Sequence, residues 1–176
     1  MTQATFFIQD LKRMVGKHKI RIIHVWLSRS FAGVFIYRLE RSWYLLFGNL
    51  YGYMRVPFIP IVYLIHAYSN IDIHYKANIK GGLSILHPSV GCVISARANI
   101  GQNLTLVGGN VIGVGNKGGP SEFIVGNNCT LGANATIIGP LKLGDNIQIG
   151  AAACVVKDCL VHNAILVGIP AKIIKS

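Results

Sequence analysis

The sequence predicts a mainly β protein, in which a three-sided parallel β-helix follows a short helical segment. From Val125 an aliphatic residue returns at every sixth position, seven times in succession, and the same period appears upstream in two shorter runs. Glycines and asparagines concentrate after Asn70, whereas aromatic residues, including Trp26 and Trp43, concentrate before it. We therefore divide the chain into a helical segment, residues 1–70, and a repeat domain, residues 71–176.

Composition and charge narrow the class of protein. The 176 residues are 52% hydrophobic and only 13% charged, which excludes a disordered chain or a coiled coil. The net charge of +11 divides into +7 before residue 71 (nine Lys and Arg against two acids) and +4 after it (eight against four). In the helical segment the cations alternate with large apolar side chains. This pattern favours either peripheral membrane contact or packing against the C-terminal part of the chain and partner subunits, and it disfavours nucleic acid as a partner.

Two amphipathic helices are expected in the helical segment, over residues 3–15 and 19–47, because apolar side chains recur at helical spacing. An apolar run from Val56 to Ile65 follows and is interrupted by Pro57 and Pro60. A transmembrane helix needs about 20 apolar residues. This run is too short to cross a bilayer.

The six-residue period predicts short strands separated by tight turns, with three strands in a coil of about 18 residues. Small or apolar side chains four positions later are expected to fill the corners, and Gly and Asn to form the turns. The Gly-rich stretch 112–124 cannot follow the period, and we expect it to be a functional excursion. The aliphatic residues expected to point inward are Ile73, Ile79, Ile85, Ile94, Ile100, Leu106, Val125, Leu131, Ile137, Leu143, Ile149, Val155 and Val161.

The cysteines indicate structural burial and a reducing compartment. Cys92, Cys129, Cys154 and Cys159 lie in apolar contexts, and no Cys-x-x-Cys pair or histidine spacing suggests a metal site. The first 20 residues lack the apolar core of a secretory signal. We expect a cytoplasmic protein, with peripheral contact at the inner face of the membrane as one role for residues 1–70.

Three features of the repeat domain are typical of one family. Ile71-Asp72-Ile73-His74 precedes Gly81-Gly82-Leu83-Ser84-Ile85-Leu86-His87, so that an Asp and a His stand fifteen residues apart, and the chain closes with Val167-Gly168-Ile169-Pro170-Ala171-Lys172. Together with the repeat, residues 71–173 resemble the left-handed β-helix, hexapeptide-repeat acyltransferases, in their serine acetyltransferase-like branch. The resemblance implies a left-handed solenoid, acetyl-CoA as co-substrate, and a homotrimer with active sites at the subunit seams.

The resemblance also implies a catalytic pair. His87 would act as the general base that takes a proton from the acceptor hydroxyl. Asp72 would hold the other imidazole nitrogen and stabilise the imidazolium. His74 is the rival base, although its position just after the Asp suggests a supporting place.

Four further positions match the acetyl-CoA contacts of the family. Gly113 would lie near the thioester, Ala133 and Ala151 beside the pantetheine arm, and Lys172 near the nucleotide. No metal is implied.

The acceptor is where the sequence departs from the family. Serine acetyltransferases carry an Arg-His pair in the excursion that holds the carboxylate of serine, whereas this chain has Pro120-Ser121-Glu122. We therefore expect O-acetylation of a sugar hydroxyl in capsular, exopolysaccharide or lipid-linked glycan synthesis, with Ser121, Glu122 and Asn110 as acceptor contacts. Two alternatives stay open: serine O-acetylation, and a non-catalytic β-helix that serves as a binding or scaffold module.

Overall fold

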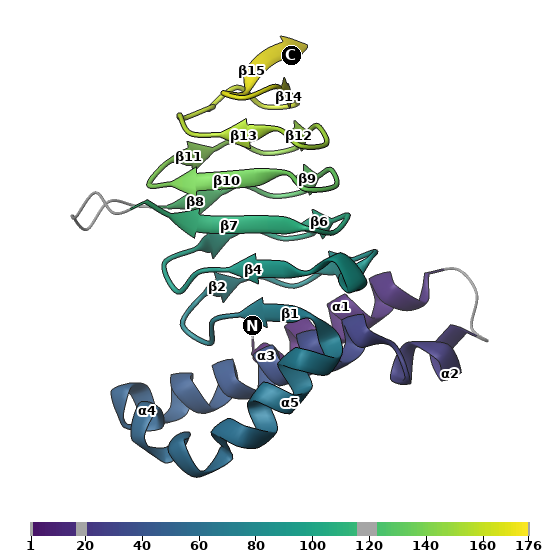
Figure 1. Cartoon of the computed structure of the whole chain (residues 1–176), viewed down its shortest axis with the longest axis vertical. Helices are drawn as coiled ribbons and strands as arrows, with labels where there is room; N and C mark the ends of the chain where they lie inside the picture. Colours follow the sequence, from purple (N-terminus) through teal and green to yellow (C-terminus); the bar gives the residue numbers. More distant parts are fainter. Residues whose placement is uncertain (1, 17–20, 116–122, 176) are drawn as a thin grey trace.

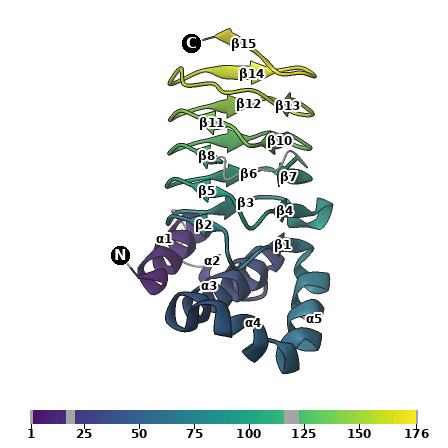
Figure 2. The same ribbon diagram turned by 90° about the vertical axis from the view of Figure 1, so that its left-hand side faces the viewer.

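The computed structural model describes residues 2–16, 21–115 and 123–175. It shows a tall solenoid standing on a base of helices (Figure 1). The base lies at one end of the long axis, and the C-terminus lies at the other end (Figures 1 and 2). The last helix ends at Ser69 and the first strand begins at Ile71.

The base begins with three helices, α1 (Gln3–Val15), α2 (Arg21–Trp26) and α3 (Arg29–Phe47). The prediction for residues 3–15 is confirmed, but the single helix predicted over 19–47 is wrong. The chain breaks at Ser28, whose backbone is extended and whose hydroxyl accepts a hydrogen bond from the Phe31 N–H at 3.1 Å. Ser28 is thus the N-cap of α3, and α2 has to end before it.

The remaining helices fold back beneath the solenoid. They are the 3₁₀ turn η1 (Gly48–Leu50), α4 (Tyr51–Met54), the 3₁₀ turn η2 (Val56–Phe58) and α5 (Ile59–Ser69). Pro57 and Pro60 occupy first-turn positions of η2 and α5, where no backbone N–H is needed. Among the described residues, no single helix is long and apolar enough to cross a membrane. The helical stretches Arg29–Met54 and Val56–Ser69 meet at a bend of 76°, and together they have the length and composition of a broken span.

The solenoid consists of three sheets whose strands stack in parallel, apart from the last one. Sheet A has the order β1-β4-β7-β10-β13, sheet B the order β11-β8-β5-β2, and sheet C the order β15-β14-β12-β9-β6-β3. Among the strands of the described residues, β15 alone runs antiparallel, against β14. A 3₁₀ turn, η3 (Pro88–Val90), lies between β3 and β4. The strands are β1 (Ile71–Ile73), β2 (Asn78–Ile79), β3 (Ser84–Ile85), β4 (Cys92–Ile94), β5 (Asn99–Ile100), β6 (Thr105–Leu106), β7 (Asn110–Val114), β8 (Ile124–Val125), β9 (Thr130–Leu131), β10 (Thr136–Gly139), β11 (Lys142–Leu143), β12 (Gln148–Ile149), β13 (Cys154–Val155), β14 (Ile165–Val167) and β15 (Lys172–Lys175).

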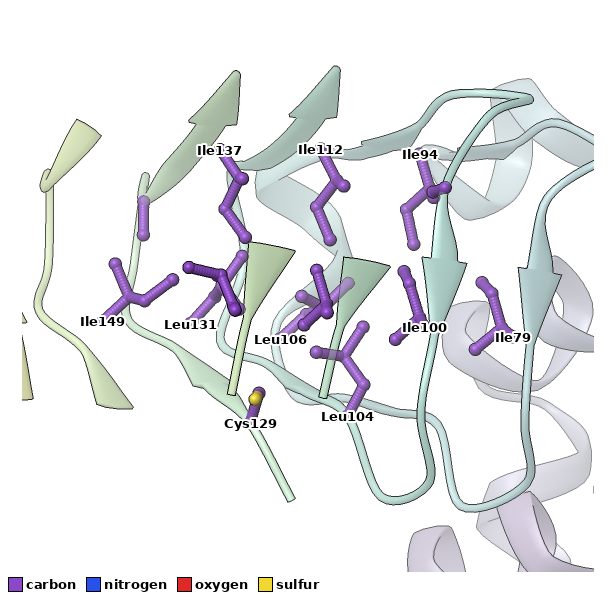
Figure 3. Packing of buried hydrophobic residues seen from close by; sticks show 14 of the residues in the cluster. Ile79, Ile94, Ile100, Leu104, Leu106, Ile112, Cys129, Leu131, Ile137 and Ile149 are labelled. Carbon is purple, nitrogen blue, oxygen red and sulfur yellow. The ribbon is translucent and has the colours of Figure 1, made fainter. Parts of the chain in front are cut away.

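The aliphatic residues of the six-residue period form the core, as Figure 3 shows for part of it. Every one of them that the sequence predicts to point inward is buried except Val161, which is exposed. Cys159, two residues before Val161, makes the parallel bridge to Leu143 and is buried, so it takes the inward position of this coil in place of Val161. The cysteines are free thiols, and Cys92, Cys129 and Cys159 are buried as predicted, while Cys154 is half-buried.

Glycine and asparagine have separate tasks in the turns. Asn103, Asn128 and Asn146 adopt positive φ, and their side-chain amides form a ladder, with Nδ2 to Oδ1 distances of 2.9 and 3.0 Å. Gly126 has no unusual φ, but a Cβ there would lie 2.3 Å from the Gly144 carbonyl oxygen of the neighbouring coil. Asparagine therefore supplies the left-handed conformation, and glycine allows the coils to stack closely.

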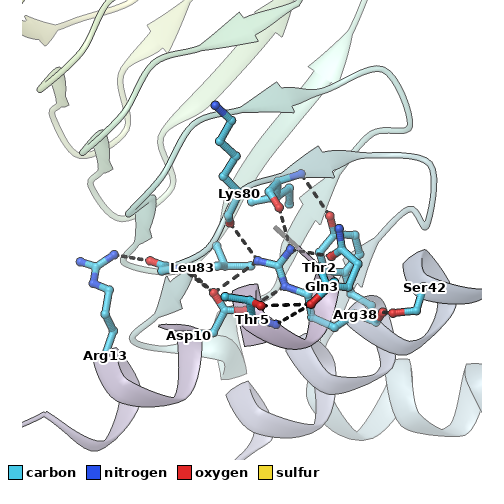
Figure 4. A network of polar contacts seen from close by, with 12 residues as sticks. Thr2, Gln3, Thr5, Asp10, Arg13, Arg38, Ser42, Lys80 and Leu83 are labelled. Atoms are coloured by element: carbon cyan, nitrogen blue, oxygen red, sulfur yellow. Dashed lines mark hydrogen bonds and ion pairs between the residues drawn. The ribbon is translucent and has the colours of Figure 1, made fainter. Parts of the chain in front are cut away.

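Side chains of the base cover the open lower edge of the first coil (Figure 4). The Asp10 carboxylate accepts hydrogen bonds from the backbone N–H groups of Gly82 and Leu83, each at 2.7 Å. Arg38 donates to the carbonyls of Ile79 and Lys80 at 2.6 and 2.9 Å, and its Nε lies 2.8 Å from the Asp10 carboxylate. A solenoid end needs a cap because its outermost coil has no neighbour to bond.

Three further residues of α3 complete this cap. The Tyr37 hydroxyl donates to the Ala77 carbonyl at 3.0 Å and accepts from the Ile79 N–H at 3.2 Å. Ser30 Oγ donates to the carbonyl of Ile85, and Arg41 donates to that of Lys76. Packing of the helical segment against the C-terminal part is therefore confirmed for Arg38 and Arg41, which are buried against the solenoid, and the expectation that their charge faces a membrane or partner subunits is wrong.

Candidate functional site

One edge of the solenoid, where sheet C passes into sheet A, carries three of the predicted site residues. His87 follows β3, Ala133 follows β9 and Ala151 follows β12; the level of β6 separates the first two, and the last two are adjacent. The turns are in register, because the Ala152 N–H donates to the Ala133 carbonyl at 2.8 Å. The structure thus brings the predicted base and the predicted pantetheine positions onto one line along the long axis.

His87 lies exposed at the lowest turn of this edge. Its backbone N–H donates to the Val107 carbonyl of the next coil at 2.9 Å, and Pro88 starts the 3₁₀ turn η3 directly after it. Within the described parts of the chain its imidazole makes no hydrogen bond or ion pair. The neighbouring coil therefore fixes the backbone of His87, and the exposed imidazole ring is accessible to an acceptor.

Gly108 is a site feature that the sequence argument missed. A Cβ at this position would lie 2.5 Å from the His87 carbonyl oxygen and 2.6 Å from the Val90 side chain, and φ is +144°. Glycine thus lets the upper coil close over the turn that presents His87. The Gly108-Gly109 pair, which stands between two runs of the repeat, is the signal that could have revealed it.

Asp72 points outward from β1, and its side chain is 66% exposed. Its carboxylate oxygen lies 3.7 Å from Nδ1 of His66, on α5, and no contact with His87 is present among the described residues. The two members of the predicted pair are therefore separate in the single chain. His66 is the immediate imidazole neighbour of Asp72, and no sequence pattern had singled it out.

A cavity of about 220 Å³ lies between Asp72 and the turn that follows His87. It is lined by His66, Asp72 and Val93, and by Val90 and Gly91 of the His87 turn, together with other residues. Cys92 also lines it, but burial raises the pKa of its thiol and disfavours the reactive thiolate. The cavity has a carboxylate, an imidazole and an apolar wall, which suits a small polar acceptor.

His74, the rival base, makes its contacts with residues of its own turn. Its Nδ1 accepts a hydrogen bond from the Lys76 N–H at 3.1 Å, and its ring stacks on Tyr75 with the centroids 4.5 Å apart. Burial, and then the charge of Lys76, lower its pKa. His74 therefore has a structural place in the first turn.

The other predicted contacts with acetyl-CoA lie near, but not on, the His87 line. Gly113 is on β7 in sheet A, opposite Ile138 of β10. Lys172 begins β15, directly after the uppermost turn of the edge, where the Ala171 N–H donates to the Cys154 carbonyl. Lys172 is exposed, as a contact with a phosphate requires.

The structure describes one of the three predicted acceptor contacts, Asn110. Asn110 is 1% exposed, and its amide donates to the carbonyls of Gly132 and Ala135 and accepts from the Gly108 N–H. Its amide is committed to the corner of the solenoid, but Asn110 also lines the cavity next to Asp72, so a contact between Asn110 and the acceptor stays a prediction. Ser121 and Glu122 lie outside the described residues.

The chain is similar in structure to solved serine acetyltransferases. The Neisseria gonorrhoeae enzyme aligns with a TM-score of 0.78 and 24% identity over 98% of this chain and 66% of that one. The soybean apoenzyme gives 0.75 and 25% over 98% and 69%, and an Entamoeba histolytica enzyme in complex with L-cysteine gives 0.70 and 25% over 93% and 62%. No protein-family model and no curated protein matches the sequence.

These alignments extend beyond the solenoid. Because 98% of the chain aligns, the helical base is part of the match. The chain spans about two thirds of the length of the Neisseria enzyme. The fold is that of a left-handed β-helix acyltransferase with a helical N-terminal part, and the solved structures named above are serine acetyltransferases.

Proposed function

We propose that this protein is an acetyl-CoA-dependent O-acetyltransferase whose acceptor is the hydroxyl group of serine. The observation that carries the proposal is the alignment of nearly the whole chain with serine acetyltransferases, together with an exposed His87 at the foot of a continuous edge. The resemblance assigns the thioester to the region of Gly113 and the pantetheine arm to Ala133 and Ala151. Lys172 supplies a positive charge near the nucleotide end.

In the proposed reaction His87 removes the proton of the acceptor hydroxyl as its oxygen attacks the thioester carbonyl. A tetrahedral intermediate forms, and a backbone N–H of the nearby loop stabilises its oxyanion. The carbon–sulfur bond then breaks, and the imidazolium gives its proton to the departing coenzyme A thiolate, which restores neutral His87. The acetyl ester and free coenzyme A are the products.

Asp72 is proposed to support the charged form of an imidazole in this site. An exposed carboxylate next to the acceptor cavity stabilises an imidazolium that forms during the reaction. In the single chain the neighbour of Asp72 is His66, so pairing with His87 requires a side-chain movement within the site.

A sugar acceptor is the second candidate. It is favoured by Pro120-Ser121-Glu122, which has no cation to hold a carboxylate and carries an acid that repels one. The test is the release of coenzyme A thiol from acetyl-CoA with serine and with a set of nucleotide sugars, and mass detection of the acetyl product. Serine is expected to be the better substrate by at least about tenfold in kcat/KM. A sugar that exceeds serine would replace the proposal with the second candidate.

The sites are proposed to lie at the seams of a homotrimer. Asp72 shares sheet A with exposed aliphatic side chains, and an apolar face next to a polar site is typical of a subunit interface. These side chains are Val93, Val111, Ile138 and Val156. Sedimentation equilibrium is expected to give three chains per particle, and Val111→Glu is expected to give monomers with little activity.

A further inference from the structure

The helical base contains an apolar groove that neither the solenoid nor the proposed reaction uses. It lies between α3 and α5, has a volume of about 310 Å³, and is walled by Phe35, Leu39 and Trp43 on α3, by Phe58 at the end of η2 and by Ile61 on α5. This volume is within the range of small-molecule sites, at its lower end. All five of these side chains remain partly exposed to solvent, so the walls lack a partner in the single chain.

One charged residue, Glu40, is present among the described residues that line this groove. Glu40 is 2% exposed. Its Oε1 accepts hydrogen bonds from the Tyr51 hydroxyl at 3.0 Å and from Arg55 Nε. Its Oε2 is buried and has no hydrogen-bond partner among the described residues. A carboxylate oxygen in an apolar site is costly to leave unpaired, and Glu40 lines the groove, so a ligand there that reaches Oε2 would supply the missing donor.

The charge around Glu40 decides which kind of donor fits. Arg55 already neutralises the carboxylate, and burial together with the Glu40 charge raises the pKa of the Tyr51 hydroxyl, which keeps Tyr51 a neutral donor. A second cation would meet the positive charge of Arg55, whereas a neutral O–H adds a hydrogen bond without adding charge. A negatively charged headgroup would be repelled by Oε2.

We propose that the α3–α5 groove binds a neutral lipid-like alcohol, with its apolar body between the two helices and its hydroxyl donating to Glu40 Oε2. The site is distinct from the His87 edge, which lies on the solenoid. The proposal therefore does not depend on the acetyl-transfer activity.

The direct test is the binding of 1-decanol to the full chain, compared with its methyl ether and with decanoate. Trp43 lines the groove, so a Trp26→Phe background makes its emission the reporter of occupancy. We expect saturable binding of one decanol per chain, with the ether and decanoate at least about tenfold weaker, because a hydrogen bond to a charged acceptor is lost. Equal affinities for decanol and its ether would overturn the proposal.

Three variants sharpen this test. Ile61→Phe fills the groove and is expected to weaken decanol binding at least tenfold, while Leu64→Phe, on the exposed side of the same helix, is expected to change it less than twofold. Glu40→Gln turns an amide N–H toward the groove, because Tyr51 and Arg55 keep the oxygen, and should abolish the preference for alcohol over ether. Equal effects of Ile61→Phe and Leu64→Phe would contradict the proposal. Failure of decanol to bind, with Ile61→Phe shifting the sedimentation coefficient, would assign the groove to a second copy of the chain and also contradict it.

Discussion

The solenoid and the helical base bury different kinds of group. Inside the solenoid the described core is aliphatic, and each coil satisfies the backbone of the next through parallel ladders. Where the base meets the first coil, the buried groups are a carboxylate, a guanidinium and a phenol, because backbone groups without a neighbouring coil need polar partners. The comparison teaches that a repeat stabilises itself along its axis, whereas its end needs specific side chains.

The largest loss of stability is expected at the base. Arg38→Ala leaves the Asp10 carboxylate buried without its cation, and such a change costs about 3–5 kcal/mol in free energy of unfolding. Lys12→Ala, on the exposed side of α1, is the matched control and should stay within about 0.5 kcal/mol. Urea denaturation measures both. A loss below about 1 kcal/mol for Arg38→Ala would contradict the view that this pair closes the solenoid.

In the solenoid, Leu131→Ala is expected to cost about 2–5 kcal/mol, because it opens a cavity in a fully buried aliphatic stack. Val161→Ala, at an exposed position, should cost much less. The same denaturation experiment compares the two, and equal losses would show that the six-residue period does not define the core.

A smaller effect is expected from Tyr37→Phe, which removes only the hydroxyl that bridges Ala77 and Ile79. Two buried backbone groups lose their partner, so we expect a loss of about 1–3 kcal/mol. Tyr68→Phe removes an exposed hydrogen bond to the Leu27 carbonyl and serves as the control, with a loss below about 0.5 kcal/mol. If the two variants had the same melting temperature, the Tyr37 hydroxyl would not stabilise the first coil, which would contradict its role in the cap.

The smallest effect concerns pH. Burial lowers the pKa of His74 in the folded chain, so the unfolded chain, with a pKa of about 6.5, takes up a proton first as the pH falls. The stability contributed by neutral His74 is present above pH 6.5 and is lost below it. His74→Gln should therefore flatten the fall in melting temperature between pH 7 and 5. An unchanged slope would contradict the lowered pKa.

The sequence predicted the solenoid well because its period is local. Leu131 and Ile137 are identified by spacing alone, and α1 by its amphipathic pattern. The break between α2 and α3 was missed, although Ser28 is a typical N-cap residue that could have marked it. No local pattern could have paired Asp10 with Arg38, because these residues lie on different helices and are 28 positions apart in the sequence.

The candidate site was predictable in its positions but not in its contacts. The family resemblance selected His87, Ala133 and Ala151, and the regular coil length brings them onto one edge. For Asn110 the sequence could not separate two uses, because an amide in a turn serves a corner and a ligand equally well. His66 was missed because its contact with Asp72 comes from the way α5 enters the first strand.

The measurement that tests the proposed activity most directly is the release of coenzyme A thiol from acetyl-CoA in the presence of serine, by the wild type and by His87→Ala. His87 is exposed, so the variant should keep its melting temperature. Loss of a general base predicts a fall in kcat of about 10²–10⁴-fold. Turnover of the variant within about threefold of the wild type would contradict the account.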